Sequence, residues 1–264
     1  MPLTPDDRPD LGPLAGVAAE VAAEWGLELE EPFALARYSF VAPAGADAVL
    51  KLVPPEDDEA DEEADALELW AGDGAVRLLR HDRARRALLV ERARPGTDLA
   101  DLPEADATVI AVDLASRLWK GGQTRGLSPV PSGRFRSIHD HLPRWLENAR
   151  DHPLAPAARE LYAALDRRAD VVVHGDFHHH NVLSSQRGWL AIDPKPMLGE
   201  PEYDVASFLW NPLPYRMQLD VTERRLEAFA AAGLDERRLR AWAVIRGAYL
   251  GADPDEIEVL RALV

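Results

Sequence analysis

The sequence contains no cysteine, and this absence excludes two kinds of protein. Neither a disulfide framework nor a metal site with thiolate ligands can form. Apolar residues make up 47% of the 264 residues, yet no apolar run is long enough to span a bilayer. The N-terminal segment also lacks a basic region followed by an apolar core, so no secretory signal is visible. We therefore expect a globular cytoplasmic protein with one large domain or two small ones.

Positive charge is also scarce. The 46 acidic residues outnumber the 30 basic ones, which gives a formal net charge of −16. Nucleic acids and anionic membranes both bind basic surfaces, so this composition disfavours both as partners. It favours a cationic small molecule, although an acidic surface also serves solubility. The sequence carries no prediction of oligomeric state.

Lysine is rarer than arginine. The chain has only three lysines, Lys51, Lys120 and Lys195, against 27 arginines. Where arginine dominates to this extent, a lysine is expected at places that need a compact ammonium group. The sequence predicts strands at residues 33–43, 48–53, 75–79 and 87–91, and Lys51 lies inside the second of them, a buried strand. It could extend outward from an edge strand, but a role in binding phosphate explains its position better.

One segment, residues 171–183, organises the rest of the chain. Its sequence is Val-Val-Val-His-Gly-Asp-Phe-His-His-His-Asn-Val-Leu. The three valines predict a short strand that leads into a loop with His174 and Asp176. The spacing His-x-Asp-x-x-x-x-Asn, completed by Asp193, matches the catalytic loop and metal-binding aspartate of phosphoryl-transfer enzymes. In this match Asp176 accepts the proton of the acceptor hydroxyl.

The catalytic segment continues into a predicted hairpin. Residues 182–184 and 189–192 are expected to form two short strands joined by a turn. Pairing the strands about Arg187 sets Asn181 opposite Asp193. Amide and carboxylate oxygens suit Mg²⁺, which takes its other ligands from water and phosphate. Asn181 and Asp193 are therefore the predicted metal ligands.

The segments His174-Gly175-Asp176-Phe177-His178 and Ile192-Asp193-Pro194-Lys195, together with Asn181, resemble the aminoglycoside phosphotransferase family, and most closely its streptomycin and hydroxyurea branch. The resemblance implies a two-lobed, protein-kinase-like α+β fold, with a small antiparallel sheet in the first lobe and mainly helices in the second. It also implies transfer of a phosphoryl group from ATP, with Mg²⁺, to a hydroxyl of a small molecule such as streptomycin. We place the lobes at residues 1–92 and 93–264, on either side of a proline- and glycine-containing linker.

The resemblance also assigns the residues that would position ATP. Lys51 would pair with the α and β phosphates and needs a glutamate partner from the next helix. The acidic segment 56–71 is the candidate helix, and most of its acids should form a solvated face. Glu63 lies instead on its apolar stripe. Glu63 is therefore the predicted partner, with Glu59 and Glu62 as fallbacks.

The glycine-rich loop of protein kinases is missing. The corresponding segment, Arg37-Tyr38-Ser39-Phe40, contains no glycine. This loop varies among aminoglycoside kinases, so Ser39 and backbone amides become the candidates for covering the γ-phosphate. The resemblance further implies that backbone groups of Glu91 and Ala93 hold the adenine edge, although an ordinary loop is an equally good interpretation.

Helical periodicity dominates the sequence after the linker. It predicts helices at residues 104–120, 138–148, 157–165, 205–210, 221–232, 237–249 and 255–263. Asp204 could simply cap one of these helices, but the resemblance implies that it braces the catalytic loop. Glu200 is a second acid that we expect near the acceptor.

Other functions remain compatible with these motifs. A metal-dependent hydrolase could use the histidine-rich residues 174–180, although tetrahedral sites usually draw their ligands from separated elements. A binding module could hold nucleotide without transferring phosphate, but the complete set of catalytic residues argues against it. Kinases of other small metabolites, such as choline, homoserine or fructosamines, share these motifs and would differ only in their acceptor.

Overall fold

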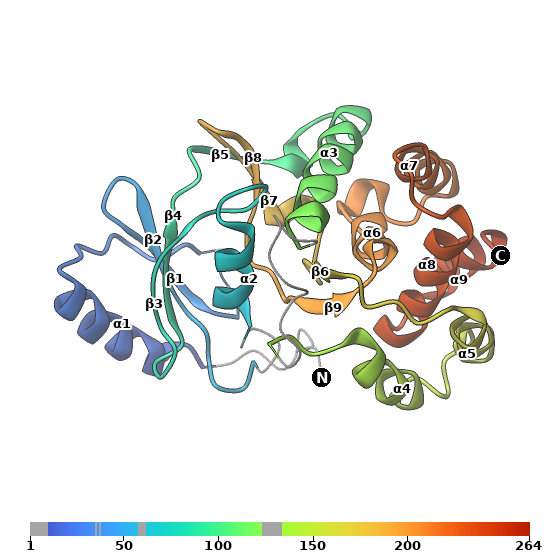
Figure 1. Ribbon diagram of the computed structural model, residues 1–264, viewed down its shortest axis with the longest axis horizontal. Coiled ribbons are helices and arrows are strands. Elements are labelled where there is room, and N and C mark those ends of the chain that lie inside the picture. The colour runs from blue at the N-terminus through green and yellow to red at the C-terminus, as the bar shows by residue number, and fades with distance from the viewer. Residues whose placement is uncertain (1–9, 35, 37, 58–61, 123–133) are drawn as a thin grey trace.

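The computed structural model describes residues 10–34, 36, 38–57, 62–122 and 134–264. The chain forms two lobes, with the N-terminal elements on the left of Figure 1 and the helices of the second half on the right. No helix within the described residues is long and apolar enough to cross a membrane.

A four-stranded antiparallel sheet with strand order β1-β2-β4-β3 forms the N-terminal lobe. Its strands are β1 (Phe40–Ala44), β2 (Ala48–Leu52), β3 (Leu78–Asp82) and β4 (Ala87–Glu91). Helix α1 (Gly12–Trp25) packs on this sheet through a small core of its own, and the left-handed backbone of Gly26, with φ 67°, ends the helix.

Two strands of this sheet differ from the sequence prediction. The first covers only the end of the expected segment 33–43. Strand β3 was expected at residues 75–79 but begins at Leu78, because the residues before it pair with another strand. Ala75 forms a bridge with Ala191, and the N–H of Val76 donates to the carbonyl of Ala191. This contact ties the first lobe to the catalytic hairpin.

Helix α2 (Glu63–Trp70) lies beside the sheet, between the two lobes in Figure 1. It is shorter than the predicted segment 56–71, because Pro54 and Pro55 follow β2 and residues 55–56 form a turn. Its first residue, Glu63, is buried.

Seven helices make up most of the second lobe in the described chain. They are α3 (Glu104–Gly122), α4 (Ile138–Asn148), α5 (Ala155–Ala164), α6 (Pro201–Leu209), α7 (Leu219–Ala231), α8 (Glu236–Leu250) and α9 (Pro254–Ala262). Short 3₁₀ turns lie at Leu99–Asp101, His179–Asn181 and Leu213–Tyr215. Helix α8 packs against α4, α5, α6, α7 and α9, and is buried on nearly every side. The second lobe is therefore built around α8.

Two small sheets lie where the lobes meet. One pairs β6 (Val171–Val173) with β9 (Met197–Gly199), and the other has the order β5-β7-β8. The strands of the latter are β5 (Pro95–Asp98), β7 (Val182–Ser185) and β8 (Gly188–Ala191). The first lobe's sheet ends at Glu91, whereas β5 already pairs with the catalytic hairpin. This arrangement suits the boundary placed after residue 92, which stays a prediction.

Candidate active site

The catalytic loop begins where the fully buried strand β6 ends. Gly175 has φ +81°, and a Cβ atom built there would lie 1.9 Å from the carbonyl oxygen of Lys195. Only glycine fits so close to another backbone segment in this conformation. The N–H of Lys195 in turn donates to the carbonyl of His174 at 2.8 Å. The loop is therefore held directly against the segment that follows Asp193.

Asp204 holds this loop in place through hydrogen bonds to its backbone. Its carboxylate is fully buried and accepts the backbone N–H groups of His174 at 2.8 Å and Gly175 at 2.7 Å. It also accepts the indole N–H of Trp119 at 3.0 Å. Helix α6 begins at Pro201, earlier than predicted, so Asp204 lies in its first turn and does not cap it. The contacts are those expected of a residue that braces the loop.

Replacing Asp204 with alanine is expected to destabilise the fold severely. The change leaves three buried donors without an acceptor, and each such loss costs about 1–3 kcal/mol. Denaturant unfolding should show a loss of about 3 kcal/mol or more. The exposed cap Asp235→Ala is a suitable control, expected to cost about 1 kcal/mol. Equal losses for the two variants would contradict the bracing role.

His174 is fully buried and joins two segments through hydrogen bonds of its ring. Burial lowers the pKa of its fully buried ring, so the imidazole is neutral at physiological pH. Its Nε2 donates to the carbonyl of Ile192 at 3.0 Å, and its Nδ1 accepts the N–H of Asp176 at 3.3 Å. The sequence pattern grouped His174 with the catalytic residues, and that role stays a prediction. Its buried side chain links the catalytic loop to the residue before Asp193, which favours a positioning role.

Asp176 lies at the surface of the loop with half-buried oxygens. His178 Nε2 is 3.5 Å from Asp176 Oδ2, and Arg246 Nη2 is 3.9 Å from Oδ1. Burial alone would raise the pKa of Asp176, but the charges of His178, Lys195 and Arg246 lower it below its ordinary value. The carboxylate raises the pKa of His178 in return, against the effect of burial. Asp176 is therefore ionised at neutral pH and able to accept a proton.

The hairpin pairs differently from the sequence prediction. Val182 pairs with Ala191, so Asn181 faces Ile192 and not Asp193, and Ile192 donates its N–H to the carbonyl of Asn181. The one-residue shift arises because the turn contains two residues and not three. Asp193 leaves the strand with φ 55°, a left-handed conformation that aspartate tolerates better than most residues.

Both predicted metal ligands nevertheless lie beside the catalytic loop. Asn181 Nδ2 donates to the carbonyl of Asp176 at 2.9 Å. The fixed amide nitrogen leaves the Asn181 oxygen, for which the described residues show no donor, available as a ligand. The Asp193 carboxylate is half-exposed and acts electrostatically on both Asp176 and His178.

Lys51 joins the first lobe to this site. Its buried ammonium lies 2.6 Å from Glu63 Oε2 and also contacts Asp193 Oδ1. Burial alone would lower the pKa of Lys51, but the two carboxylates raise it above its ordinary value. The ion pair predicted between Lys51 and Glu63 is thus present. Of the fallbacks, Glu62 pairs with Arg136 at 2.9 Å, and Glu59 lies outside the described residues.

The contacts of the other residues assigned to the nucleotide do not point to a particular role. Ser39 is half-buried immediately before β1. Glu91 ends β4, where its carboxylate pairs with Arg187 at 2.6 Å and its N–H donates to the carbonyl of Arg77. Ala93 lies half-buried in the linker. Their roles toward ATP stay predictions.

Glu200 is buried inside the protein and does not line the cavity beside Asp176. It is fully buried and pairs with Arg238, whose second nitrogen donates to the carbonyl of Asp166 at 2.8 Å. A buried, paired carboxylate cannot contact an acceptor, so the structure corrects this prediction. The Glu200–Arg238 pair instead connects the start of α6 to α8.

The histidine side chains of the catalytic segment point to different partners. His178 faces Asp176, His180 Nδ1 contacts Asp98 Oδ2 at 2.8 Å, and the ring of His179 stacks on Phe208 at 4.0 Å. The described residues contain no group of three or more histidine or acidic side chains arranged to hold a metal. This divergence contradicts the zinc-hydrolase alternative.

A cavity of about 220 Å³ opens beside Asp176, between the catalytic loop, α4, α8 and the segment after Asp193. Its lining includes Arg136, Arg144, Trp145, Lys195, Arg246 and Tyr249. The sequence analysis assigned no role to His178, Lys195 or Arg246. The scarcity of lysine and the place of His178 within the motif were available signals for two of them. No local pattern marks Arg246, which reaches the site from α8.

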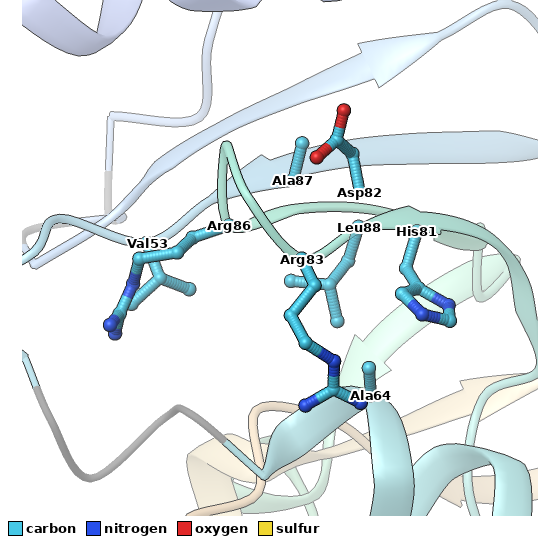
Figure 2. A pocket seen from close by; sticks show the side chains of 8 residues that line it. All are labelled: Val53, Ala64, His81, Asp82, Arg83, Arg86, Ala87 and Leu88. Atoms are coloured by element: carbon cyan, nitrogen blue, oxygen red, sulfur yellow. The ribbon is translucent and has the colours of Figure 1, made fainter.

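A second hollow lies in the first lobe, between the β3–β4 turn and α2 (Figure 2). Its volume is only about 40 Å³, which is room for very few water molecules. Arg83 beside it pairs with Asp65 at 2.8 Å. This hollow is too small to compete with the cavity at Asp176 as a substrate site.

Comparison with known proteins identifies the family of this chain. Residues 35–256 match the family model described as aminoglycoside/hydroxyurea antibiotic resistance kinase. A hydroxyurea phosphotransferase from Kitasatospora aureofaciens is 35% identical over 246 residues, covering 88% of this chain and 71% of that protein. A streptomycin 3″-kinase from Klebsiella pneumoniae is 36% identical over 217 residues, covering 75% and 76% of the two chains.

A solved GDP and kanamycin complex of APH(2″)-IIIa has the same fold. Its TM-score is 0.61 at 14% identity, and the alignment covers 94% of this chain and 97% of the other. The predicted two-lobed, protein-kinase-like α+β fold is confirmed, as is the family resemblance. The chain belongs to the aminoglycoside/hydroxyurea antibiotic resistance kinase family and is a phosphotransferase.

Proposed function

We propose that this protein transfers the γ-phosphoryl group of ATP, with Mg²⁺, to a hydroxyl group of a small molecule. One observation supports this most strongly. Lys51 from the first lobe contacts both Glu63 and Asp193, so the residues for binding phosphate and metal meet beside Asp176. Nucleotide use is further supported by the GDP bound to a protein of the same fold.

The ligand set fits Mg²⁺. Asn181 offers an amide oxygen and Asp193 a carboxylate, which are the hard oxygen donors that this ion prefers. Bound there, Mg²⁺ would supply positive charge to neutralise the phosphoryl group in transfer. The ammonium of Lys51 contacts both Glu63 and Asp193, so it lies next to the proposed metal site. Lys51 would bind the α and β phosphates of ATP there, and Glu63 would hold its side chain in position.

Asp176 would receive the acceptor. Its ionised carboxylate lines the cavity of about 220 Å³ and can accept a hydrogen bond from a hydroxyl placed there. Its lowered pKa suits a base that orients the nucleophile and takes its proton late, as expected for a loose phosphoryl-transfer transition state. Asp204 and His174 would maintain the position of this carboxylate through the loop backbone.

The family and its named members suggest the first acceptors to test. Streptomycin represents the aminoglycoside or aminocyclitol acceptors expected from the resemblance, and hydroxyurea is named for the relative from Kitasatospora aureofaciens. Kinases of other small metabolites remain the alternative. Dependence on ATP would place the reaction in the cytoplasm.

The direct experiment is a screen for acceptor-dependent ADP formation. Purified protein would be given Mg²⁺ and ATP or GTP with streptomycin, hydroxyurea, other aminoglycosides and a library of hydroxylated metabolites. We expect at least one acceptor to raise ADP or GDP release well above the rate without acceptor, and mass spectrometry to find one added phosphoryl group. Nucleotide binding without transfer to any acceptor would favour the binding-module interpretation.

A further inference from the structure

The turn of the catalytic hairpin, between β7 and β8, carries a side chain to which the reaction chemistry gives no role. Arg187 reaches from this turn to the first lobe, where its Nε and Nη2 donate to the two carboxylate oxygens of Glu91 at 2.9 and 2.6 Å. Its Nη1 also donates to the carbonyl of Gly72 at 2.9 Å. The planar guanidinium suits this paired geometry, and such charge-assisted pairs are among the stronger hydrogen bonds of proteins.

Both partners of Arg187 belong to segments that carry a residue of the proposed phosphate site. Glu91 ends β4, and β4 pairs along its whole length with β2, the strand that contains Lys51. Gly72 lies just after α2, the helix that begins with Glu63. One side chain of the hairpin therefore holds both elements that supply the ion pair between Lys51 and Glu63.

The same hairpin leads to the proposed metal site. Strand β8 begins directly after Arg187, and Asp193 follows two residues after the strand ends. Because Lys51 contacts Asp193, the first lobe and the hairpin are joined by an ion pair near each end of β8. Between the two pairs, the N–H of Ala191 donates to the carbonyl of Gly74 at 2.8 Å. ATP and Mg²⁺ would bind at the Lys51 end, whereas the Arg187 end joins protein only to protein.

The pair between Arg187 and Glu91 is partly shielded from solvent. The two side chains are 29% and 19% exposed, so their attraction is screened less than that of a surface pair, which contributes little. The hydrogen bonds from Arg187 lower the pKa of Glu91 below its ordinary value, against the effect of burial. The N–H of Arg77 donates to the same carboxylate at 3.1 Å and fixes its orientation. The carboxylate is therefore ionised and held in place at neutral pH.

We infer that Arg187 is a positioning residue for nucleotide binding, because it sets the separation between the first lobe and the catalytic hairpin. The inference rests on the proposed kinase function. Loss of the pair with Glu91 lets Lys51 and Asp193 vary in distance, and the ATP phosphates with their metal must reach both at once. A site that is less preorganised binds its ligand more weakly. The acceptor is unaffected, because neither Arg187 nor Glu91 lines the cavity beside Asp176.

Arg187→Gln removes the charge and the paired donors. It should raise the Kd for Mg²⁺-ATP and the KM for ATP about tenfold, and change the KM for the acceptor by less than about twofold. Arg85→Gln is the matched control, because Arg85 is 28% exposed in the β3–β4 turn and contacts Glu24 and Asp82 at 2.7 Å, all within the first lobe. The control should bind ATP like the original protein. An unchanged KM for ATP in Arg187→Gln, or equal rises in both variants, would overturn the inference.

Glu91→Gln tests the pair from its other partner and leaves the backbone groups of Glu91 unchanged. It also provides the test if Arg187→Gln does not fold. Glu91→Gln should raise the KM for ATP to the same extent, and the double variant should bind ATP no more weakly than either single variant. Losses that multiply in the double variant would show that the two side chains act separately, which contradicts the inference.

The absence of cysteine allows the separation of the lobes to be measured directly. Leu79→Cys on β3 and Arg237→Cys on α8 place one spin label at an exposed position in each lobe. Pulsed electron paramagnetic resonance should give a broader distance distribution with Arg187→Gln than with Arg85→Gln or neither change. An equally narrow distribution would refute the inference while the kinase proposal stands. If the labelled original protein neither binds Mg²⁺-ATP nor transfers phosphate, both fail together.

Discussion

Replacing Asp176 with asparagine is expected to lower kcat by roughly 10²- to 10⁴-fold, the usual contribution of a positioned general base. The amide keeps the size of the carboxylate but cannot accept the proton of the acceptor hydroxyl. The residues proposed to bind nucleotide and metal, Lys51, Glu63 and Asp193, are untouched by this change. The Kd for Mg²⁺-ATP should therefore stay within a few-fold of the original. Steady-state kinetics and calorimetry would measure the two effects separately.

Asp170→Asn makes the same chemical change at an exposed position just before β6 and serves as the control. It should retain full turnover. Near-normal turnover in Asp176→Asn would show that another group accepts the proton. A parallel loss of nucleotide binding would show instead that Asp176 belongs to the metal site.

Replacing Asp193 with alanine is expected to weaken nucleotide binding in the presence of Mg²⁺ by at least about tenfold, since ligand charge strongly sets the affinity of such sites for divalent cations. Asn181→Ala should have a smaller effect, because an amide contributes a dipole and a carboxylate contributes a full charge. Asp193→Ala also removes one of the two carboxylates that contact Lys51. Fluorescence titration with a labelled ATP analogue would give the three dissociation constants.

Binding measured in EDTA provides the control for the metal. Without Mg²⁺ the Asp193→Ala variant should bind nucleotide about as well as the original protein, since the lost ligand acts through the ion. An equal loss with and without Mg²⁺ would mean that Asp193 acts mainly through Lys51. A larger loss for Asn181→Ala would reverse the assignment of the main ligand.

The residues that lie together around Asp176 could be identified from sequence because the patterns that mark them are local. The spacing from His174 to Asn181 fits one loop and one turn, and Lys51 stood out as a lysine within a buried strand. Within the helix that the resemblance pointed to, Glu63 followed from helical periodicity, and the structure places it 2.6 Å from Lys51. In each case a short stretch of sequence indicates both which residue matters and which way its side chain faces.

Features that depend on exact turns or on distant segments could not be predicted. The hairpin register was missed by one residue, because residue types alone did not show whether the turn held two residues or three. The burial of His174 and Glu200 was also missed, since it depends on α6 and α8 packing over them. The cavity beside Asp176 combines residues of α4 and α8, about 100 residues apart in the chain, so no local pattern could show its lining.

The most direct test follows the phosphoryl group itself. ATP labelled in its γ-phosphate would be mixed with excess protein and the acceptor found in the screen, with Mg²⁺ or with EDTA, and with the original protein or Asp176→Asn. We predict that the label appears on a hydroxyl oxygen of the acceptor within one turnover, and only when both Mg²⁺ and Asp176 are present. Label released as inorganic phosphate with the acceptor unchanged, or the same product without Mg²⁺ or Asp176, would contradict the proposed mechanism.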